Sequence, residues 1–362
     1  MIPFQLRCLG QIMEPLPGDP HEVEGVTNPA AVRGPDGELY LFPRLVGRGN
    51  FSRIGLARVC FNAAGEPSGV ERLGLALEPE ADYERQPGGG GGCEDARVMY
   101  VEPLKHYVMA YTGLSDHGPR IALAVSEDLF HWRRLGLVSF MPYDGIDFDP
   151  DNKDASVFPV AIPNPTGQPS LAILHRPMFP GTRPEEKARD GASSGIDLHR
   201  ESIWISYRSM ALLDEKPYPL CHFTSHHRLA APVAPWERLK IGGGTPPVMT
   251  RHGWLILYHG VCEIKEPGNG THPLCYSAGV MVLAGKEPSI VRYRSPEPVL
   301  TPELPQERHG VKANVVFPTG IDRRDDLACP DRLDVYYGMA GNRIGVARMD
   351  LPERLPAEGD QR

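Results

Sequence analysis

The sequence lacks the features that mark several protein classes. Its 7 cysteines are scattered and odd in number, and no CxxC pair occurs, so neither a zinc site nor a disulfide framework is indicated. No apolar run, the N-terminal MIPFQLRCLGQIMEPLPGDP included, is long enough for a signal peptide or a membrane span. Lys and Arg form no stripe and the formal net charge is -8, which argues against a nucleic-acid partner. We therefore expect a soluble, cytoplasmic protein with reduced cysteines that does not bind membranes.

Glycine and proline, by contrast, are abundant. The 362 residues include 39 glycines and 38 prolines, and these lie between short apolar runs. Helices would be broken this often, whereas short strands joined by turns would not. The composition therefore predicts an all-β protein.

One pattern recurs along the chain. A short apolar run, a polar turn, a second apolar run with a polar tip and a third run are found together five times, and the copies begin near Asn28, Glu94, Lys153, Thr245 and Asn314. Each copy is large enough for a four-stranded antiparallel sheet, and radial repetition of such sheets makes a β-propeller. We expect a single five-bladed β-propeller domain over residues 1–362. A β-sandwich is the alternative.

Two segments stand apart from the repeat. Residues 179–201 are polar and charged with Gly and Ser, and we interpret them as a surface insertion, either a lid over a site or a tolerated loop. The tail after Asp350 is also polar, and we expect it to be frayed.

The second run of each copy ends in polar or aromatic side chains: Arg44, Thr112, His175 with Arg176, Tyr258 with His259, and Tyr336 with Tyr337. A buried strand does not end in His or Arg unless that group reaches water, a partner or a ligand. The ends of equivalent strands converge near the axis of a propeller, so the repeat predicts one axial pocket. Taken singly, His259 could be a hydrogen-bonded core histidine, Arg176 a salt-bridge partner and Lys240 a solvated lysine.

The stretch GGGGGCEDARVMY places Glu94 and Asp95 between five glycines and an apolar run. Glycines allow turns that other residues cannot adopt and let a backbone approach a ligand closely. A carboxylate at the start of a strand is either a candidate acid or base, or a turn residue.

The phrases GCEDARV, KDASVFP, LHRP, KIGGGTPPV, GWLILYHGV, NVVFPTG and VYYGMA, in this order, resemble glycoside hydrolase family 130 from about Asn28 to Ala347. The family comprises β-mannoside phosphorylases and some β-mannosidases, and the resemblance implies a five-bladed β-propeller. It implies that Asp95 is the general acid. It further implies phosphate-binding residues Lys153, Arg176, Lys240 and His259, and sugar-binding residues Asn28, Arg44, Arg53, Glu94, Arg97, Asp154 and Tyr258.

Two positions depart from the family pattern. Ala96 replaces a proline after the acid, and Gly341 stands where the family usually has an aspartate that binds the sugar. The second change leaves the linkage and the acceptor sugar open.

The resemblance implies inverting phosphorolysis of a β-mannosidic bond, in which Asp95 donates a proton through the sugar 3-hydroxyl and phosphate attacks the opposite face. Inorganic phosphate would be the co-substrate, with no metal and no organic cofactor. If His259 binds phosphate in its charged form, its contribution should decline above about pH 6.5–7. The alternatives are a β-mannosidase in which Glu263 or Glu307 assists water, and a propeller that only binds glycans. A homo-oligomer is possible with any of these.

Overall fold

A computed structural model describes residues 4–142, 151–179, 200–212, 220–264, 273–329 and 331–356. This part of the chain is β-structure with very little helix, so the all-β prediction is confirmed. Its helices are the four-residue α1 (Pro305–Arg308) and short 3-10 turns at Asp82–Glu84, Glu102–Leu104, Met210–Leu212, Pro235–Glu237 and Asp325–Leu327. None of the helices in these ranges is long and apolar enough to cross a membrane.

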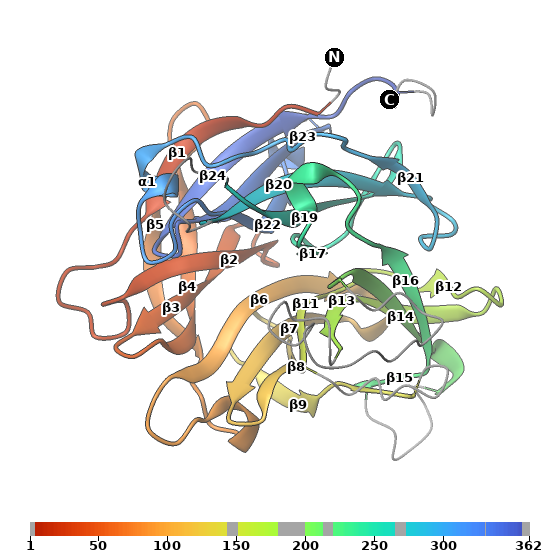
Figure 1. Cartoon of the computed structure of the whole chain (residues 1–362), viewed down its shortest axis with the longest axis horizontal. Coiled ribbons are helices and arrows are strands. Elements are labelled where there is room, and N and C mark those ends of the chain that lie inside the picture. Colours follow the sequence, from red (N-terminus) through yellow and green to blue (C-terminus); the bar gives the residue numbers. More distant parts are fainter. Residues whose placement is uncertain are drawn as a thin grey trace.

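In the described ranges, antiparallel pairing arranges most strands in five groups of four (Figure 1), and a short parallel pairing joins the first two groups into one eight-stranded sheet. Group 1 is β2 (Gly25–Arg33), β3 (Leu39–Gly47), β4 (Phe51–Phe61) and β5 (Pro67–Leu77), and group 2 is β6 (Gly91–Val101), β7 (His106–Ser115), β8 (Gly118–Ser126) and β9 (Arg133–Leu137). Group 3 is β11 (Asp151–Val157), β13 (Pro169–Met178), β14 (Ile203–Ser209) and β16 (Ser225–Ala230), and group 4 is β17 (Lys240–Gly243), β19 (Gly253–Glu263), β20 (Leu274–Leu283) and β21 (Val291–Arg294). Group 5 is β22 (Val316–Arg323), β23 (Arg332–Met339), β24 (Arg343–Asp350) and, from the other end of the chain, β1 (Arg7–Met13). Four short strands complete the sheets: β12 (Ile162–Pro163) pairs with β13, β18 (Val248–Thr250) pairs with β19, and β10 (Ser139–Phe140) pairs with β15 (His222–Phe223).

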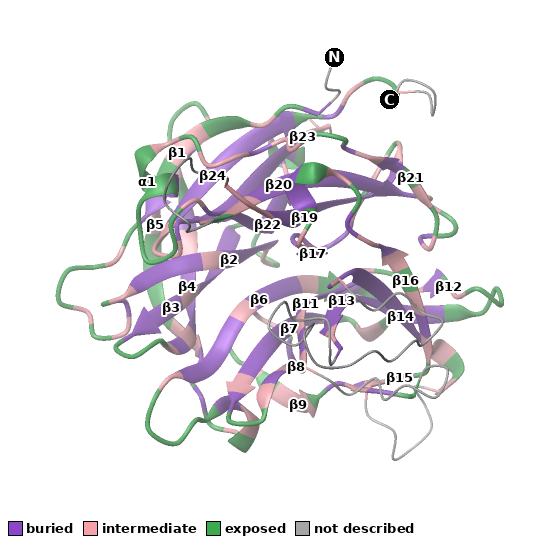
Figure 2. Cartoon of the chain, viewed as in Figure 1, coloured by how far each residue is buried: buried purple, intermediate pink, exposed green. Residues whose placement is uncertain are grey.

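Apolar clusters join these groups into a closed ring. One cluster lies between each group and the next, and a fifth joins group 5 to group 1. Strand β19 shows why its sequence is apolar without interruption: Leu255 and Leu257 pack toward group 5, whereas Ile256 and Tyr258 pack toward group 3. Successive side chains of a strand point to opposite faces, so a strand covered on both faces needs apolar residues at nearly every position. Buried residues accordingly follow the strands, and exposed residues occupy the turns (Figure 2).

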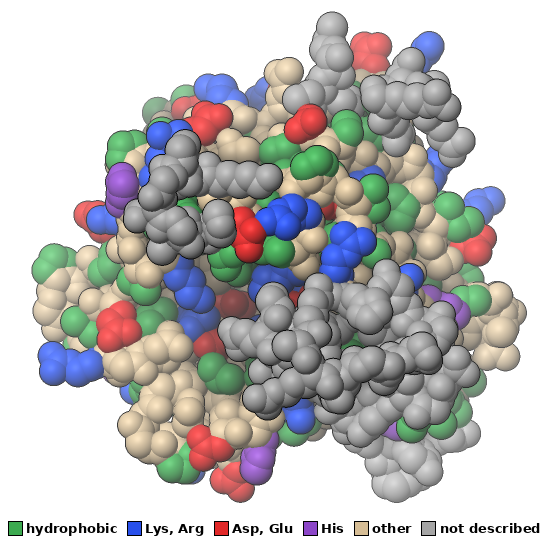
Figure 3. Space-filling model, viewed as in Figure 1, with side chains coloured by type: hydrophobic (Ala, Val, Ile, Leu, Met, Phe, Trp, Pro, Cys, Tyr) green, Lys and Arg blue, Asp and Glu red, His purple; other side chains and the backbone are tan. Residues whose placement is uncertain are grey.

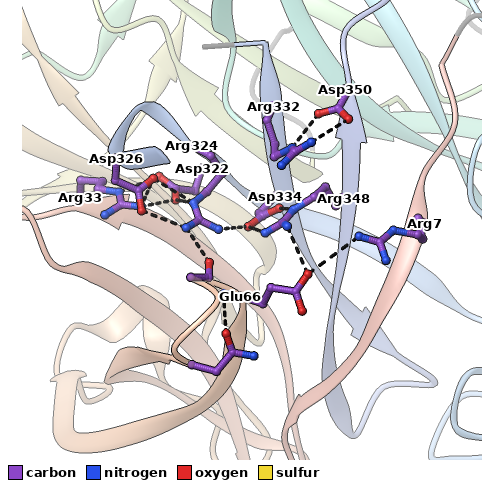
Figure 4. A network of polar contacts seen from close by, with 12 residues as sticks. Arg7, Arg33, Glu66, Asp322, Arg324, Asp326, Arg332, Asp334, Arg348 and Asp350 are labelled. Carbon is purple, nitrogen blue, oxygen red and sulfur yellow. Dashed lines mark hydrogen bonds and ion pairs between the residues drawn. The ribbon is translucent and has the colours of Figure 1, made fainter. Parts of the chain in front are cut away.

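A buried charge network also closes the ring between groups 5 and 1 (Figure 4). Arg33 of β2 donates to both carboxylate oxygens of Asp322 in β22, at 3.0 and 2.7 Å. Next to it, Arg324 donates to Asp334 at 2.7 Å, and Arg348 donates to the same carboxylate at 2.6 and 2.9 Å. Arg324 and Asp334 are fully buried. The partners therefore compensate charges that would otherwise be costly to bury.

The two segments that stand apart from the repeat are described only in part. Phe179 and Glu201, the ends of the expected insertion, are both buried, and residues 180–199 lie outside the described residues. In the tail, Leu351 is buried in the cluster between groups 4 and 5, and Leu355 packs against that cluster. Packing thus continues past Asp350 as far as Leu355, and residues 357–362 lie outside the described residues.

Candidate active site

The first strands of groups 1, 2 and 3 share an unusual backbone feature. Asn28, Asp95 and Asp154 have left-handed φ values of 44, 50 and 59°, and each lies at a register shift in β2, β6 or β11. Asn314, just before β22, has φ 59°. Asn and Asp tolerate this conformation better than other residues with a side chain, and such residues gather at functional sites. The bulges therefore place equivalent Asn and Asp side chains at the centre of the ring.

Asn28, Asp95 and Asp154 line a cavity of about 320 Å³. The cavity brings together eight of the residues that the sequence predicted for the site: Asn28, Arg44, Asp95, Lys153, Asp154, Arg176, Lys240 and His259. They come from the first four groups of strands. On the face shown in Figure 3, basic and acidic side chains gather in a hollow near the middle of the molecule, where Figure 1 shows β2, β6 and β17 approaching one another.

Asp95 accepts contacts from two neighbours. Asn28 Nδ2 donates to its Oδ1 at 2.9 Å, and Arg44 Nη1 lies 3.4 Å from the same oxygen. Burial by itself would raise the pKa of Asp95, but Arg44, Arg97 and Lys153 and the Asn28 hydrogen bond hold it below its ordinary value. Without ligands, Asp95 is therefore an ionised carboxylate at neutral pH.

Glu94 is buried and holds two of these cations. Arg44 Nη2 lies 2.7 Å from its Oε1, and Lys153 Nζ lies 3.1 Å from its Oε2. Glu94 does not line the cavity itself. The sequence predicted a sugar contact for it, and the structure places it behind the arginine and the lysine that approach Asp95.

Asp154 is the centre of a second cluster. Arg176 Nε donates to its Oδ2 at 2.6 Å, Arg97 Nη2 lies 3.6 Å from its Oδ1, and His259 Nε2 lies 3.8 Å from its Oδ2. Burial would raise the pKa of Asp154, but Arg176, His259 and Arg97 hold it well below its usual range. Arg176 also contacts Glu201 through Nη1. The predicted phosphate residue Arg176 is therefore fixed by two carboxylates.

The remaining predicted phosphate residues lie beside this cluster. Burial, together with the positive charges of Arg176 and Lys240, lowers the pKa of His259 to about 3, although Asp154 opposes this shift. The ring of His259 lies 4.5 Å from that of Phe317, centroid to centroid. Burial, followed by Arg176, also lowers the pKa of Lys240, whose Nζ lies over the ring of Tyr276. His259 is thus neutral in the unliganded site, so the expectation of a charged histidine up to about pH 6.5–7 does not describe this state.

Besides Glu94, three predicted sugar-binding residues do not line the cavity. Arg97 is buried and donates to the backbone oxygens of Gly243, Gly244 and Asp95, so it ties the inner strands together. The guanidinium of Arg53 stacks on Phe51 and pairs with Glu78. Tyr258 is fully buried, and its hydroxyl accepts a hydrogen bond from Arg294.

The structure adds residues that the sequence did not indicate. Glu24 lines the cavity, and its carboxylate accepts the backbone N–H groups of Gly49 and Asn50 at 2.7 and 2.9 Å. Asn50 in turn accepts a hydrogen bond from Arg44. The cavity is also lined by Thr27, Val46, Met178, Tyr276, Val311, Lys312, Val315, Phe317 and Gly341. Gly341, where the resemblance leads one to expect an aspartate, thus lines the cavity and supplies no carboxylate there.

The two glutamates named for a water-assisted reaction do not line the cavity. Glu263 pairs with Arg238. Glu307 is buried and accepts hydrogen bonds from the backbone N–H groups of Glu303 and Leu304 and from the hydroxyl of Tyr337. Both carboxylates are therefore engaged in structural contacts.

Known proteins that are similar to this chain point to one family. The family model described as beta-1,4-mannooligosaccharide phosphorylase (glycoside hydrolase family 130) matches residues 12–355. A 1,2-beta-oligomannan phosphorylase from Thermoanaerobacter sp. is 30% identical over 266 residues, which is 72% of this chain and 69% of that protein. A beta-1,2-mannobiose phosphorylase from Listeria innocua is 28% identical over 265 residues, 73% of this chain and 59% of that protein.

Similarity also extends to solved structures. The structure of a beta-1,2-mannobiose phosphorylase from Listeria innocua, in complex with beta-1,2-mannobiose, aligns with a TM-score of 0.68 and covers 95% of this chain and 94% of that one, at 22% identity. At this level of identity, the similarity concerns the overall fold. Together with the family match over nearly the whole chain, it leads to one conclusion: the protein is a member of glycoside hydrolase family 130.

Proposed function

We propose that the protein is an inverting glycoside phosphorylase that cleaves a β-mannosidic bond with inorganic phosphate and releases α-mannose 1-phosphate. One observation carries the proposal: a carboxylate, Asp95, lines the same cavity as the basic residues Lys153, Arg176 and Lys240. Glycosidic cleavage needs a proton for the departing oxygen and a nucleophile for the anomeric carbon. Phosphate is already an anionic nucleophile, so the site needs cations to hold it rather than a second catalytic carboxylate.

In this proposal the two clusters divide the reaction between them. Asp95, aligned by Asn28 and Arg44, supplies the proton through the 3-hydroxyl of the mannosyl unit. Arg176 and Lys240 bind phosphate on the opposite side and hold it in line with the anomeric carbon. His259 lies next to them as a neutral hydrogen-bonding group before phosphate binds. Attack from the face opposite the leaving group inverts the configuration, which gives the α-phosphate.

The names of the relatives suggest which bond to test first. Two of the curated relatives are phosphorylases of β-1,2-linked mannosides, whereas the family model carries a β-1,4 description. We therefore propose β-1,2-linked mannosides as the first substrates and β-1,4-linked mannosides as the second. Gly341 favours an acceptor or mannosyl unit that does without a carboxylate contact at that position.

The deciding experiment measures the product. The purified protein is incubated with β-1,2-mannobiose while phosphate is titrated from zero, and mannose and mannose 1-phosphate are quantified separately. The proposal expects mannose 1-phosphate to appear in amounts that depend on phosphate. If both mannosyl units are released as free mannose, at a rate that does not depend on phosphate, the protein is a hydrolase instead. That alternative is disfavoured because Glu263 and Glu307 are held in other contacts away from the cavity.

We also infer that the five groups of strands are the blades of one five-bladed propeller. The support is the closed succession of five apolar clusters, the last of which joins group 5 to group 1. A cytoplasmic location and the absence of a zinc site and of a nucleic-acid partner remain parts of the proposal, supported by the composition. A reaction without an organic cofactor and a homo-oligomeric state are also parts of the proposal.

A further inference from the structure

A second and larger cavity, of about 1040 Å³, lies beside the first and is not used by the proposed reaction. We call it the flanking groove. Three segments line it, together with Leu137 at the end of β9: the turn between β3 and β4, the segment between β5 and β6, and the hairpin between β7 and β8. We propose that the flanking groove binds the distal sugar units of a mannooligosaccharide whose terminal unit occupies the cavity at Asp95. This inference rests on the proposed phosphorolysis and adds a preference for long substrates.

The first argument is position. The turn between β3 and β4 forms a wall that both spaces share, since Asn50 lines the cavity, whereas Arg48 and Phe51 line the groove. This wall is fixed, because Glu24 accepts the backbone N–H groups of Gly49 and Asn50. A chain of sugars that leaves the cavity past Asn50 therefore reaches the groove.

A second connection lies on the other side. Arg120 of the groove donates to Asp151 at 2.9 Å, and Asp151 begins the strand that carries Lys153 into the cavity. Moreover, the turns at Arg48, at His117 and at Gly341 all join the second strand of a group to its third. In antiparallel groups of the same order, such turns lie at one end of the ring. Cavity and groove consequently open at the same end.

The third argument is the chemistry of the walls. Tyr83 offers a half-buried aromatic ring, which lies close against Gly113, where a side chain would not fit. Phe51 offers a second half-buried ring, one face of which is covered by the guanidinium of Arg53. Arg48 and Arg85 are exposed, and neither has an ion pair with another described residue. Aromatic rings can pack on the C–H faces of a sugar, and guanidinium groups donate several hydrogen bonds, here to hydroxyl groups. Ligand sites typically combine such apolar surface with a few polar groups.

The groove is also firmly built. Glu84, next to Tyr83, is fully buried and accepts hydrogen bonds from Tyr111 and Arg134 and from the backbone N–H groups of Glu80 and Ala81. A wall that is already ordered loses little conformational entropy when a ligand binds. This favours an extended binding site over a tolerated surface loop.

The test compares substrate lengths. Values of kcat/KM are measured for the mannobiose and the mannohexaose of the β-1,2-linked and β-1,4-linked series, with phosphate saturating. The variants are Arg85→Ala and Tyr83→Ala, and the matched control is Arg292→Ala, an exposed arginine of β21 outside both cavities. We expect the wild-type protein to have a higher kcat/KM for the hexasaccharide than for the disaccharide. Each groove variant should reduce the ratio of these two values about 5- to 10-fold, because it loses one or two hydrogen bonds or a ring contact. The control should leave this ratio unchanged.

A ratio near one in the wild-type protein, or groove variants that behave like Arg292→Ala, would overturn the inference and leave the groove to another ligand or a protein partner. If no substrate of either length is turned over, the proposed function fails separately. Isothermal titration of the Asp95→Asn protein with the hexasaccharide then tests whether the groove binds sugar. Binding that is weakened by the additional change Tyr83→Ala supports the inference, and no binding refutes it. Thermal melting shows whether Tyr83→Ala is folded, and Arg85→Ala, at an exposed position, provides the same comparison without a loss of packing.

Discussion

Arg176 is the residue at which the phosphate proposal can be tested most sharply. Its guanidinium lines the cavity, yet only about a twentieth of the residue is exposed. Asp154 accepts from its Nε at 2.6 Å, and Glu201 contacts its Nη1. Replacement by alanine therefore removes a cation that would face phosphate, and it also leaves two carboxylates without their nearest partner.

Both consequences weaken phosphate binding. A hydrogen bond to a charged group contributes about 1.5–3 kcal/mol, which corresponds to roughly a 10- to 150-fold change in affinity. The carboxylates of Asp154 and Glu201, no longer offset, would repel a dianion as well. We therefore expect Arg176→Ala to raise the KM for phosphate by at least about 10-fold. Arg176→Lys, which retains the charge but not the planar guanidinium, should fall between wild type and alanine.

The assay titrates phosphate at a fixed, saturating concentration of β-1,2-mannobiose and reports kcat and KM from the formation of mannose 1-phosphate. Since breaking a buried ion pair can cost about 3–5 kcal/mol of stability, each variant is compared by urea unfolding and assayed only where it is folded. Arg292→Ala serves as the control for loss of one positive charge. If folded Arg176→Ala keeps a phosphate KM within about threefold of wild type, Arg176 does not bind phosphate and the reasoning fails.

Three further predictions follow from the same contacts. Asp95→Asn should lower kcat by about 10²–10⁴-fold or more with the fold intact, because an amide retains the shape but cannot deliver the proton; near-normal turnover of mannobiose would exclude Asp95 as the acid. Asp334→Asn should reduce the free energy of unfolding in urea by about 3–5 kcal/mol, because it leaves two arginines poorly compensated in the ring closure, while the activity per folded molecule is retained. Stability should also fall as the pH falls below about 6.5, because burial depresses the pKa of His175, His226 and His259 in the folded state, so that the unfolded chain binds more protons. This contribution to stability is fully present above that pH and is lost toward pH 4 and 3. Urea titrations at pH 7, 6 and 5 would detect the loss.

The repeat in the sequence was informative because it reports local structure. The five copies begin near the residues that open the inner strands, and at Asn28 and Asn314 the copy begins on the residue with left-handed φ. In the next two copies that residue is the one after the start, Asp95 and Asp154. A short polar residue before an apolar run can be recognised in the sequence, so the repeat predicted the all-β architecture and a central pocket. The roles of the eight predicted residues that line the cavity came chiefly from the family resemblance.

Strand periodicity explains why some predicted residues lie elsewhere. Tyr258 and His259 are adjacent in β19, so their side chains point to opposite faces, and only His259 lies at the cavity. The same applies in β4, where Ser52 contacts Arg44 and its neighbour Arg53 pairs with Glu78 on the other face. A resemblance between sequence phrases assigns neighbouring residues of a strand to the site together, and does not show which of them points to the cavity.

The residues that the sequence did not indicate act over long distances along the chain. Glu201 reaches Arg176 from the end of a segment that its polar composition marked as an insertion. Glu24 fixes a turn 25 residues further on. Neither residue belongs to a repeated phrase, and single glutamates are common on surfaces, so only the folded arrangement identifies them.

Asp95 and Asp154 share the same backbone conformation, but their carboxylates have different surroundings. Both lie at the same bulge of successive groups with similar φ values. The side chain of Asp154 is 3% exposed and has Arg97, Arg176 and His259 around it, so its pKa is held well below the usual range and it serves to orient cations. The side chain of Asp95 is 12% exposed and opens to the cavity. Its pKa is also lowered, chiefly by Arg44 among its charged neighbours, so Asp95 is ionised in the free protein.

A phosphate dianion bound at the basic residues would offset the positive potential around Asp95 and raise its pKa, because a nearby negative charge disfavours a second one. Binding of the nucleophile would thereby favour the protonated form of Asp95, which takes its proton from solvent and then delivers it to the leaving group.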